Sequence, residues 1–134
     1  MTKLENKYEN FGSAVNRLNE ANVAYKKNSA NDIYQDALIK RFEFTFELAW
    51  KTLREFMLDQ GYSLEILSPK GVISFAWREG IISNEELWLD MLQSRNLSAH
   101  DYGRELSADI ADKISNRYCK ELTALKKYIA ETLK

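Results

Sequence analysis

The sequence predicts an all-α fold, an antiparallel up-and-down four-helix bundle with one additional short helix. Its 134 residues include only five glycines and one proline, so few positions interrupt a helix. Hydrophobic residues make up 45% of the chain, which is enough for one core, and they recur at alternating spacings of three and four. We therefore expect one helical domain that spans residues 1–134.

The first predicted helix carries apolar side chains at heptad spacing from Leu4 to Tyr25. One slot of this stripe holds a polar residue, Asn22. The polar cluster at residues 28–31 ends the helix, and Asn31 is expected to cap the next one. The short turn between them predicts two antiparallel neighbours.

The second predicted helix, from Asp32 to Gln60, is the longest and most aromatic, and Gly61 is placed to end it in a left-handed conformation. A helical wheel gives its main apolar face as Leu38, Phe42, Phe46, Ala49, Trp50, Leu53, Phe56 and Met57. The charged residues opposite are Asp36, Lys40, Glu43, Glu47, Lys51 and Arg54. A second, narrower apolar stripe consists of Ile33, Ala37, Phe44 and Leu48. One core cannot cover both apolar faces, so we expect this stripe to contact another subunit or, as the second choice, the short third helix.

Three further helices complete the predicted bundle. Ser68 caps a short helix that has proline in its first position and ends at Gly80. Asn84 starts a helix with acidic residues in its first turn and an apolar face that leads toward Arg95. Ser107 is expected to cap the last helix, which runs to the C-terminus.

The segment from Ser94 to Tyr102 holds the only histidine of the chain, His100, together with Arg95. Histidine exchanges a proton near neutral pH, and arginine offers a planar, permanent cation that matches a phosphate. Together they indicate metal-free RNA cleavage, in which His100 moves a proton to or from the 2′-hydroxyl or the leaving oxygen and Arg95 stabilises the phosphorane charge. Asn96 can orient the phosphate or the imidazole.

The spacing of Arg95 and His100 needs an explanation. On an unbroken helix, residues five apart point about 140° away from each other, so the two side chains would not converge. Either the helix breaks between Leu97 and His100, or two copies of the segment face each other across a symmetric interface and share the site. The alternative without function is that both are ordinary polar residues at a helix end, where the helix dipole favours histidine.

Other residues give weaker indications of function. Glu43 and Glu47 lie one turn apart and could bind a metal, but Glu47 and Lys51 form an ordinary i,i+4 pair, and a solvated charged face is the better explanation. We expect neither a metal nor another cofactor. Cys119 stands alone next to a core residue, so we expect it to pack rather than react. Tryptophan can stack on bases, but Trp50 and Trp88 fall on core faces.

The charge balance and the absence of long apolar runs limit the possible partners. A formal net charge of −1 argues against nonspecific coating of nucleic acid, so any RNA contact is expected to be local. A single cysteine forms no internal disulfide and does not indicate an oxidising compartment. No apolar run approaches the about 20 residues that cross a bilayer. We expect a cytoplasmic protein without a membrane contact.

Two segments resemble a known family. Arg95, Asn96, His100 and Tyr102 are similar to the Arg-polar-x3-His motif of HEPN domains, in the form with a further x-Tyr that resembles HepT-like toxins. Residues 41–51, RFEFTFELAWK, resemble the signature helix of proteins first labelled nucleotidyltransferase substrate-binding proteins. The resemblance covers essentially the whole chain.

This resemblance implies a helical-bundle homodimer that pairs with a separately encoded minimal nucleotidyltransferase in a toxin–antitoxin module. It also implies that Arg95 and His100 are ribonuclease residues with Asn96 as polar partner, and that the nucleotidyltransferase attaches AMP to Tyr102. Two functions stay open. One is a metal-independent endoribonuclease toxin that acts on RNA and is silenced by its partner. The other is a noncatalytic subunit that presents a substrate to the nucleotidyltransferase.

Overall fold

The computed structural model describes residues 1–63, 65, 68–99 and 103–134, and every regular element within these ranges is a helix. The elements are α1 (Lys3–Lys27), α2 (Asp32–Asp59), α3 (Pro69–Arg78), α4 (Glu85–Ser98), α5 (Arg104–Lys113), the π-helical turn η1 (Ile114–Tyr118) and α6 (Cys119–Leu133). None of the helices in this part of the chain is long and apolar enough to cross a membrane.

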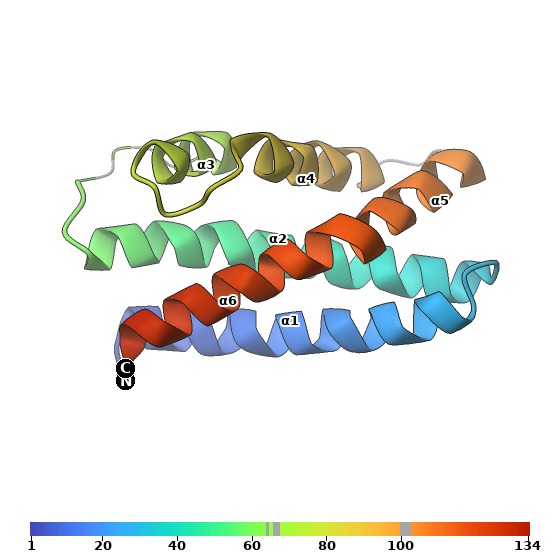
Figure 1. The fold of residues 1–134 in the computed structure, drawn as a ribbon, viewed down its shortest axis with the longest axis horizontal. Helices are drawn as coiled ribbons and strands as arrows, with labels where there is room; N and C mark the ends of the chain where they lie inside the picture. The colour runs from blue at the N-terminus through green and yellow to red at the C-terminus, as the bar shows by residue number, and fades with distance from the viewer. Residues whose placement is uncertain (64, 66–67, 100–102) are drawn as a thin grey trace.

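The helices alternate in direction along the bundle (Figure 1). α1 and α2 lie antiparallel, α3 and α4 together return along α2, and α5, η1 and α6 form one continuous helix that crosses diagonally over the others. Both chain ends lie at the same end of the bundle (Figure 1). This arrangement confirms the predicted up-and-down bundle of four long elements, with α3 as the additional short helix.

Local sequence signals set most of the helix boundaries. The predicted caps are confirmed, because the side chains of Asn31, Ser68 and Asn84 each accept a hydrogen bond from a backbone N–H in the first turn of the helix that follows. Gly61 and Gly80 have φ angles of 95° and 75°, the left-handed conformation that glycine adopts without steric cost. Both follow the end of a helix, as the sequence predicts.

The predicted start of the last long element was wrong by four residues. α5 begins at Arg104 with Gly103 as its N-cap, and Ser107 lies inside the first turn, where its N–H donates to the Gly103 carbonyl. The early start is tied to α2, since the Arg104 guanidinium lies 3.2 Å from a carboxylate oxygen of Asp32 and 3.6 Å from one of Asp36. These contacts join residues about 70 positions apart, and no local pattern reveals them.

The core forms around the main apolar face of α2, as predicted. All eight residues assigned to that face are buried, and Trp88 of α4 and Tyr118 of η1 are fully buried against it. The Phe42 and Tyr118 rings stack with centroids 5.2 Å apart, and Phe46 meets Trp88 at 6.2 Å. This aromatic cluster connects three helices and fixes α4, which carries the predicted site, against α2.

The second apolar stripe of α2 is only partly covered within the chain. Leu48 packs against the core, but Ile33 and Phe44 remain 75% and 60% exposed, and Ala37 is exposed as well. α3 therefore does not cover Ile33 or Phe44, which removes one of the two explanations offered for the stripe. A contact with a second subunit stays a prediction.

The polar residue in the apolar stripe of α1 contacts the π turn. Within η1 the Cys119 N–H donates to the Ile114 carbonyl, five residues earlier, and not to the usual fourth residue. A π turn shifts the hydrogen bonds between backbone N–H and C=O groups within the helix. The Asn22 side-chain amide donates to the Ser115 carbonyl of this turn at 3.4 Å. Asn22 is 8% exposed, so the stripe holds a buried polar residue that bonds the distorted helix.

Candidate functional site

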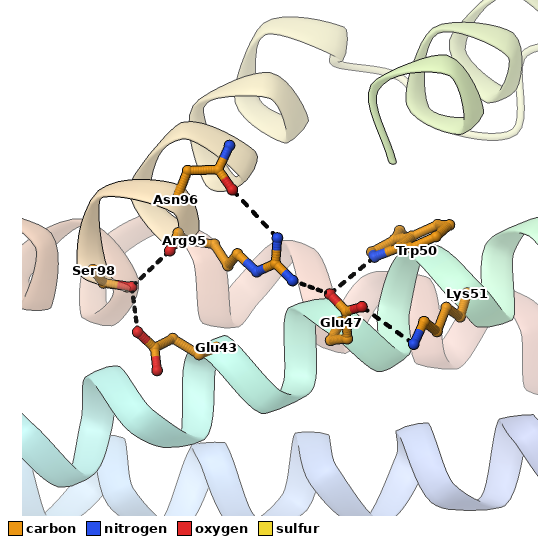
Figure 2. Close-up of polar contacts among 7 residues, drawn as sticks. All are labelled: Glu43, Glu47, Trp50, Lys51, Arg95, Asn96 and Ser98. Carbon is orange, nitrogen blue, oxygen red and sulfur yellow. Dashed lines mark hydrogen bonds and ion pairs between the residues drawn. The ribbon is translucent and has the colours of Figure 1, made fainter. Parts of the chain in front are cut away.

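Arg95 projects from the last turn of α4 toward α2 (Figure 2). Its Nη2 lies 2.5 Å from Oε2 of Glu47, and its Nη1 donates to Oδ1 of Asn96 at 3.3 Å. The Arg95 side chain is 31% exposed, so solvent reaches a guanidinium that two neighbours hold in place. The structure thus brings Arg95 and Asn96 together, and their role in binding a phosphate stays a prediction.

Glu47 collects three donors on one carboxylate. Besides Arg95, the indole Nε1 of Trp50 donates to it at 3.2 Å, and Nζ of Lys51 lies 3.2 Å away (Figure 2). Burial raises the pKa of the Glu47 carboxyl, but the hydrogen bonds from Trp50 and Lys51 and the charges of Arg95 and Lys51 outweigh it, so the pKa lies below its usual value. Glu47 is therefore ionised at neutral pH.

Glu43, one helical turn before Glu47 on α2, also contacts the end of α4. The Ser98 hydroxyl lies 2.6 Å from Oε2 of Glu43 and 3.0 Å from the Arg95 carbonyl. Lys40 completes the group at 3.9 Å from Glu43. Two glutamates one turn apart on α2 thus bond two residues one turn apart at the end of α4 (Figure 2). Glu43 bonds Ser98, and Glu47 bonds Arg95.

The predicted i,i+4 pair of Glu47 with Lys51 is confirmed, with the charged atoms 3.2 Å apart. Glu43 and Glu47 are, however, less solvated than a fully exposed charged face. Their side chains are 21% and 31% exposed, because the end of α4 packs over this part of α2. The sequence shows that Glu43 and Glu47 are one turn apart, but it does not show that α4 packs over them. Among the residues described, no three histidine, cysteine, aspartate or glutamate side chains come together as metal ligands would.

α4 ends where one of the two explanations for the motif spacing requires a break. Its last residue is Ser98, and Ala99 is the C-cap. The helix that carries Arg95 therefore ends three residues after it. His100 and Tyr102 lie outside the described residues, so their placement relative to Arg95 stays a prediction.

α4 is also held by a buried hydroxyl network that the sequence did not indicate. The Tyr118 hydroxyl lies 2.8 Å from Oγ of Ser94 and 2.5 Å from Oδ2 of Asp90. Burial raises the pKa of Tyr118, and the hydrogen bond to Asp90 raises it further. α4 is therefore fixed by Tyr118 of η1 and by Glu43 and Glu47 of α2.

The remaining candidates have the packing roles predicted for them. Trp50 and Trp88 are buried. Cys119 is 5% exposed, and burial raises the pKa of its thiol to about 11, so the thiolate is scarce at neutral pH. A groove of about 380 Å³ beside the site is lined by Lys70, Leu89, Leu92, Gln93, Asn96 and Leu97.

A family comparison agrees with this geometry. The model of the family described as nucleotidyltransferase substrate binding protein like matches residues 6–131. The chain belongs to this family. The sequence resemblance is thereby confirmed for nearly the whole chain. No curated protein matches the chain by sequence.

Solved structures show that this family member has the HEPN-like helical fold. A tri-AMPylated HEPN toxin of Shewanella oneidensis in complex with MNT antitoxin aligns over 98% of this chain and 99% of its own, with a TM-score of 0.76 and 16% identity. A toxin–antitoxin MntA–HpeT mutant aligns over 96% and 97%, with a TM-score of 0.75 and 16% identity. A protein of Thermus thermophilus aligns over 87% and 98%, with a TM-score of 0.63 and 29% identity.

Proposed function

We propose that this protein is a HepT-like toxin, a cytoplasmic metal-independent endoribonuclease that a minimal nucleotidyltransferase antitoxin neutralises. The observation that carries the proposal is the Arg95 guanidinium, held by Glu47 and Asn96 at the broken end of α4 and still in contact with solvent. Family membership supports it, as does the fold that the chain shares with toxins solved in complex with their antitoxins.

The proposed reaction uses two side chains of one motif. His100 moves a proton to or from the 2′-hydroxyl or the leaving oxygen of the RNA, and Arg95 stabilises the extra negative charge on the phosphorane. The end of α4 after Ser98 supports this role, because it removes the helical geometry that would direct the two side chains apart. Asn96, which bonds Arg95, orients the guanidinium or the phosphate.

The first test replaces each proposed catalytic residue. Arg95→Ala and His100→Ala should each abolish RNA cleavage and toxicity, with losses of about 10²-fold or more in rate, while the circular dichroism spectrum stays that of the wild type. Cleavage by the wild type should persist in EDTA. If the pure wild-type protein cuts no RNA and does not slow growth when expressed alone, the toxin proposal is wrong.

Neutralisation is proposed to occur by AMP transfer to Tyr102. The Tyr102 oxygen would attack the α-phosphorus of ATP bound to the partner, and pyrophosphate would leave. The added phosphate would pair with Arg95 and occupy the position of the substrate phosphate. The tri-AMPylated state of the Shewanella toxin, solved with its antitoxin, supports this step.

Tyr102→Phe tests this step, because it keeps the ring and removes the acceptor oxygen. The variant should remain toxic alone yet escape enzymatic neutralisation by the partner. Intact mass is measured after incubation with the nucleotidyltransferase, ATP and Mg²⁺. Wild type should gain AMP-sized increments that the variant lacks at this position. An equal gain on both proteins, or none on wild type, contradicts modification of Tyr102.

The description of the matched family favours a second candidate function. A nucleotidyltransferase substrate binding protein would present a substrate to the transferase and need no catalysis of its own. Such a subunit would bind the partner but cut no RNA, and Arg95→Ala would change only binding. The cleavage assay with pure protein therefore separates the two functions.

A further inference from the structure

Arg95 needs a fixed orientation to meet a phosphate at one place on the surface, and α4 alone does not provide it. A free arginine side chain samples many rotamers. Within α4, the Arg95 guanidinium hydrogen-bonds the exposed Asn96 side chain at 3.3 Å. The shorter contact, to Glu47 at 2.5 Å, joins the guanidinium to α2, whose buried face forms the centre of the core.

The Glu47 carboxylate is itself held in place from the core side. Trp50 donates to the same oxygen as Arg95, and this residue is only 9% exposed, so the core fixes that donor. Lys51 binds the other oxygen. The group keeps a net positive charge, since two cations share one carboxylate. It therefore remains attractive to a phosphate.

We propose that Glu47 is a positioning residue for Arg95, one that aims the guanidinium at the scissile phosphate without touching the RNA. This inference rests on the proposed function of Arg95. Among the described residues, the guanidinium donors that face neither Glu47 nor Asn96 have no hydrogen-bond partner, so they remain available to a phosphate. Glu43 makes a second contact between α2 and the end of α4, with the Ser98 hydroxyl.

The test compares Glu47→Gln with a matched control. The control, Glu20→Gln, removes an equal charge from a 74% exposed glutamate that pairs with a different arginine, Arg41. Glu47→Gln should lower kcat about 10²-fold through misorientation, while KM for RNA stays within about threefold or falls because a negative charge is lost. Glu47→Asp, which keeps the charge, should recover part of kcat. Glu20→Gln should change neither.

A second measurement needs no RNA cleavage. Phenylglyoxal modifies arginines, and peptide mass spectrometry gives the rate at Arg95 relative to Arg117, which is 53% exposed. The relative rate at Arg95 should rise several-fold in Glu47→Gln and stay unchanged in Glu20→Gln.

The outcomes separate this inference from the proposed function. A higher kcat in Glu47→Gln would mean that Glu47 competes with the substrate for Arg95, and an unchanged kcat would mean that it has no part in the reaction. Either result overturns the positioning role, as does an unchanged Arg95 modification rate. If the wild type cuts no RNA, the proposed function fails, and the modification rates alone then decide whether Glu47 holds Arg95.

Discussion

The Glu47 carboxylate should make the stability of the protein depend on pH. Its pKa is lowered in the folded state, so its ionised form stabilises the fold above the unfolded pKa of about 4.3, and this contribution is lost as the pH falls through the folded pKa. Because the side chain is 31% exposed, we expect at most about 1 kcal/mol.

Urea unfolding of wild type and Glu47→Gln tests this expectation. At pH 7 the wild type should be the more stable of the two, and the difference should persist down to about pH 5 and then shrink toward pH 3. A difference that stays constant from pH 7 to pH 3 would show that the Glu47 charge does not contribute to stability.

The end of α4 is positioned by contacts with two other elements, α2 and the π turn η1. On the η1 side, the Tyr118 hydroxyl bonds both Ser94, which precedes Arg95, and Asp90. Lys113 and Arg117 lie 3.6 and 3.8 Å from the Asp90 carboxylate, so this residue connects α4 with α5 and η1. Loss of the hydroxyl should therefore affect both stability and the site.

Tyr118→Phe removes that hydroxyl and leaves the ring stacked on Phe42. Because Ser94 is buried and would lose a partner, we expect the free energy of unfolding to fall by about 1–3 kcal/mol in urea titrations. Tyr128→Phe is the matched control on α6, since Tyr128 is 42% exposed, and its effect should stay within about 0.5 kcal/mol. Equal effects of the two changes would argue against the buried network.

For the assembly, we predict a homodimer whose interface uses the Phe44/Leu48 stripe or the segment around Arg95. Phe44 is 60% exposed, and the described residues cover its stripe only in part. Sedimentation at micromolar concentration should show a dimer. Phe44→Lys should shift it toward monomer, and Val23→Lys, at a 57% exposed site on α1, should not.

Each sedimentation result has a distinct meaning. A dimer that survives Phe44→Lys would place the interface at the segment around Arg95 and would favour a site shared between two copies. A wild-type monomer whose behaviour does not depend on concentration would contradict the homodimer.

The sequence by itself determined the features that depend on near neighbours in the chain. Asn31, Ser68 and Asn84 start helices because a cap needs only the N–H groups that follow it, and Gly61 ends one because its φ is a property of that residue. The buried face of α2 follows from the helical period. The site that the motif around Arg95 predicts stays a prediction.

Only the tertiary structure decided which polar side chains meet across the bundle. Glu47 is no more unusual in sequence than any glutamate on a charged face, and it meets Arg95 because α4 packs over that turn of α2. Asn22 interrupts an apolar stripe, and its side chain bonds a carbonyl in the π turn of another helix. Ser107 has the side chain of a local N-cap, but α5 begins earlier, at Arg104. Arg104 contacts Asp32 and Asp36 of α2. The free energy of such contacts depends on groups far apart in the chain, and periodicity and propensity contain no information about them.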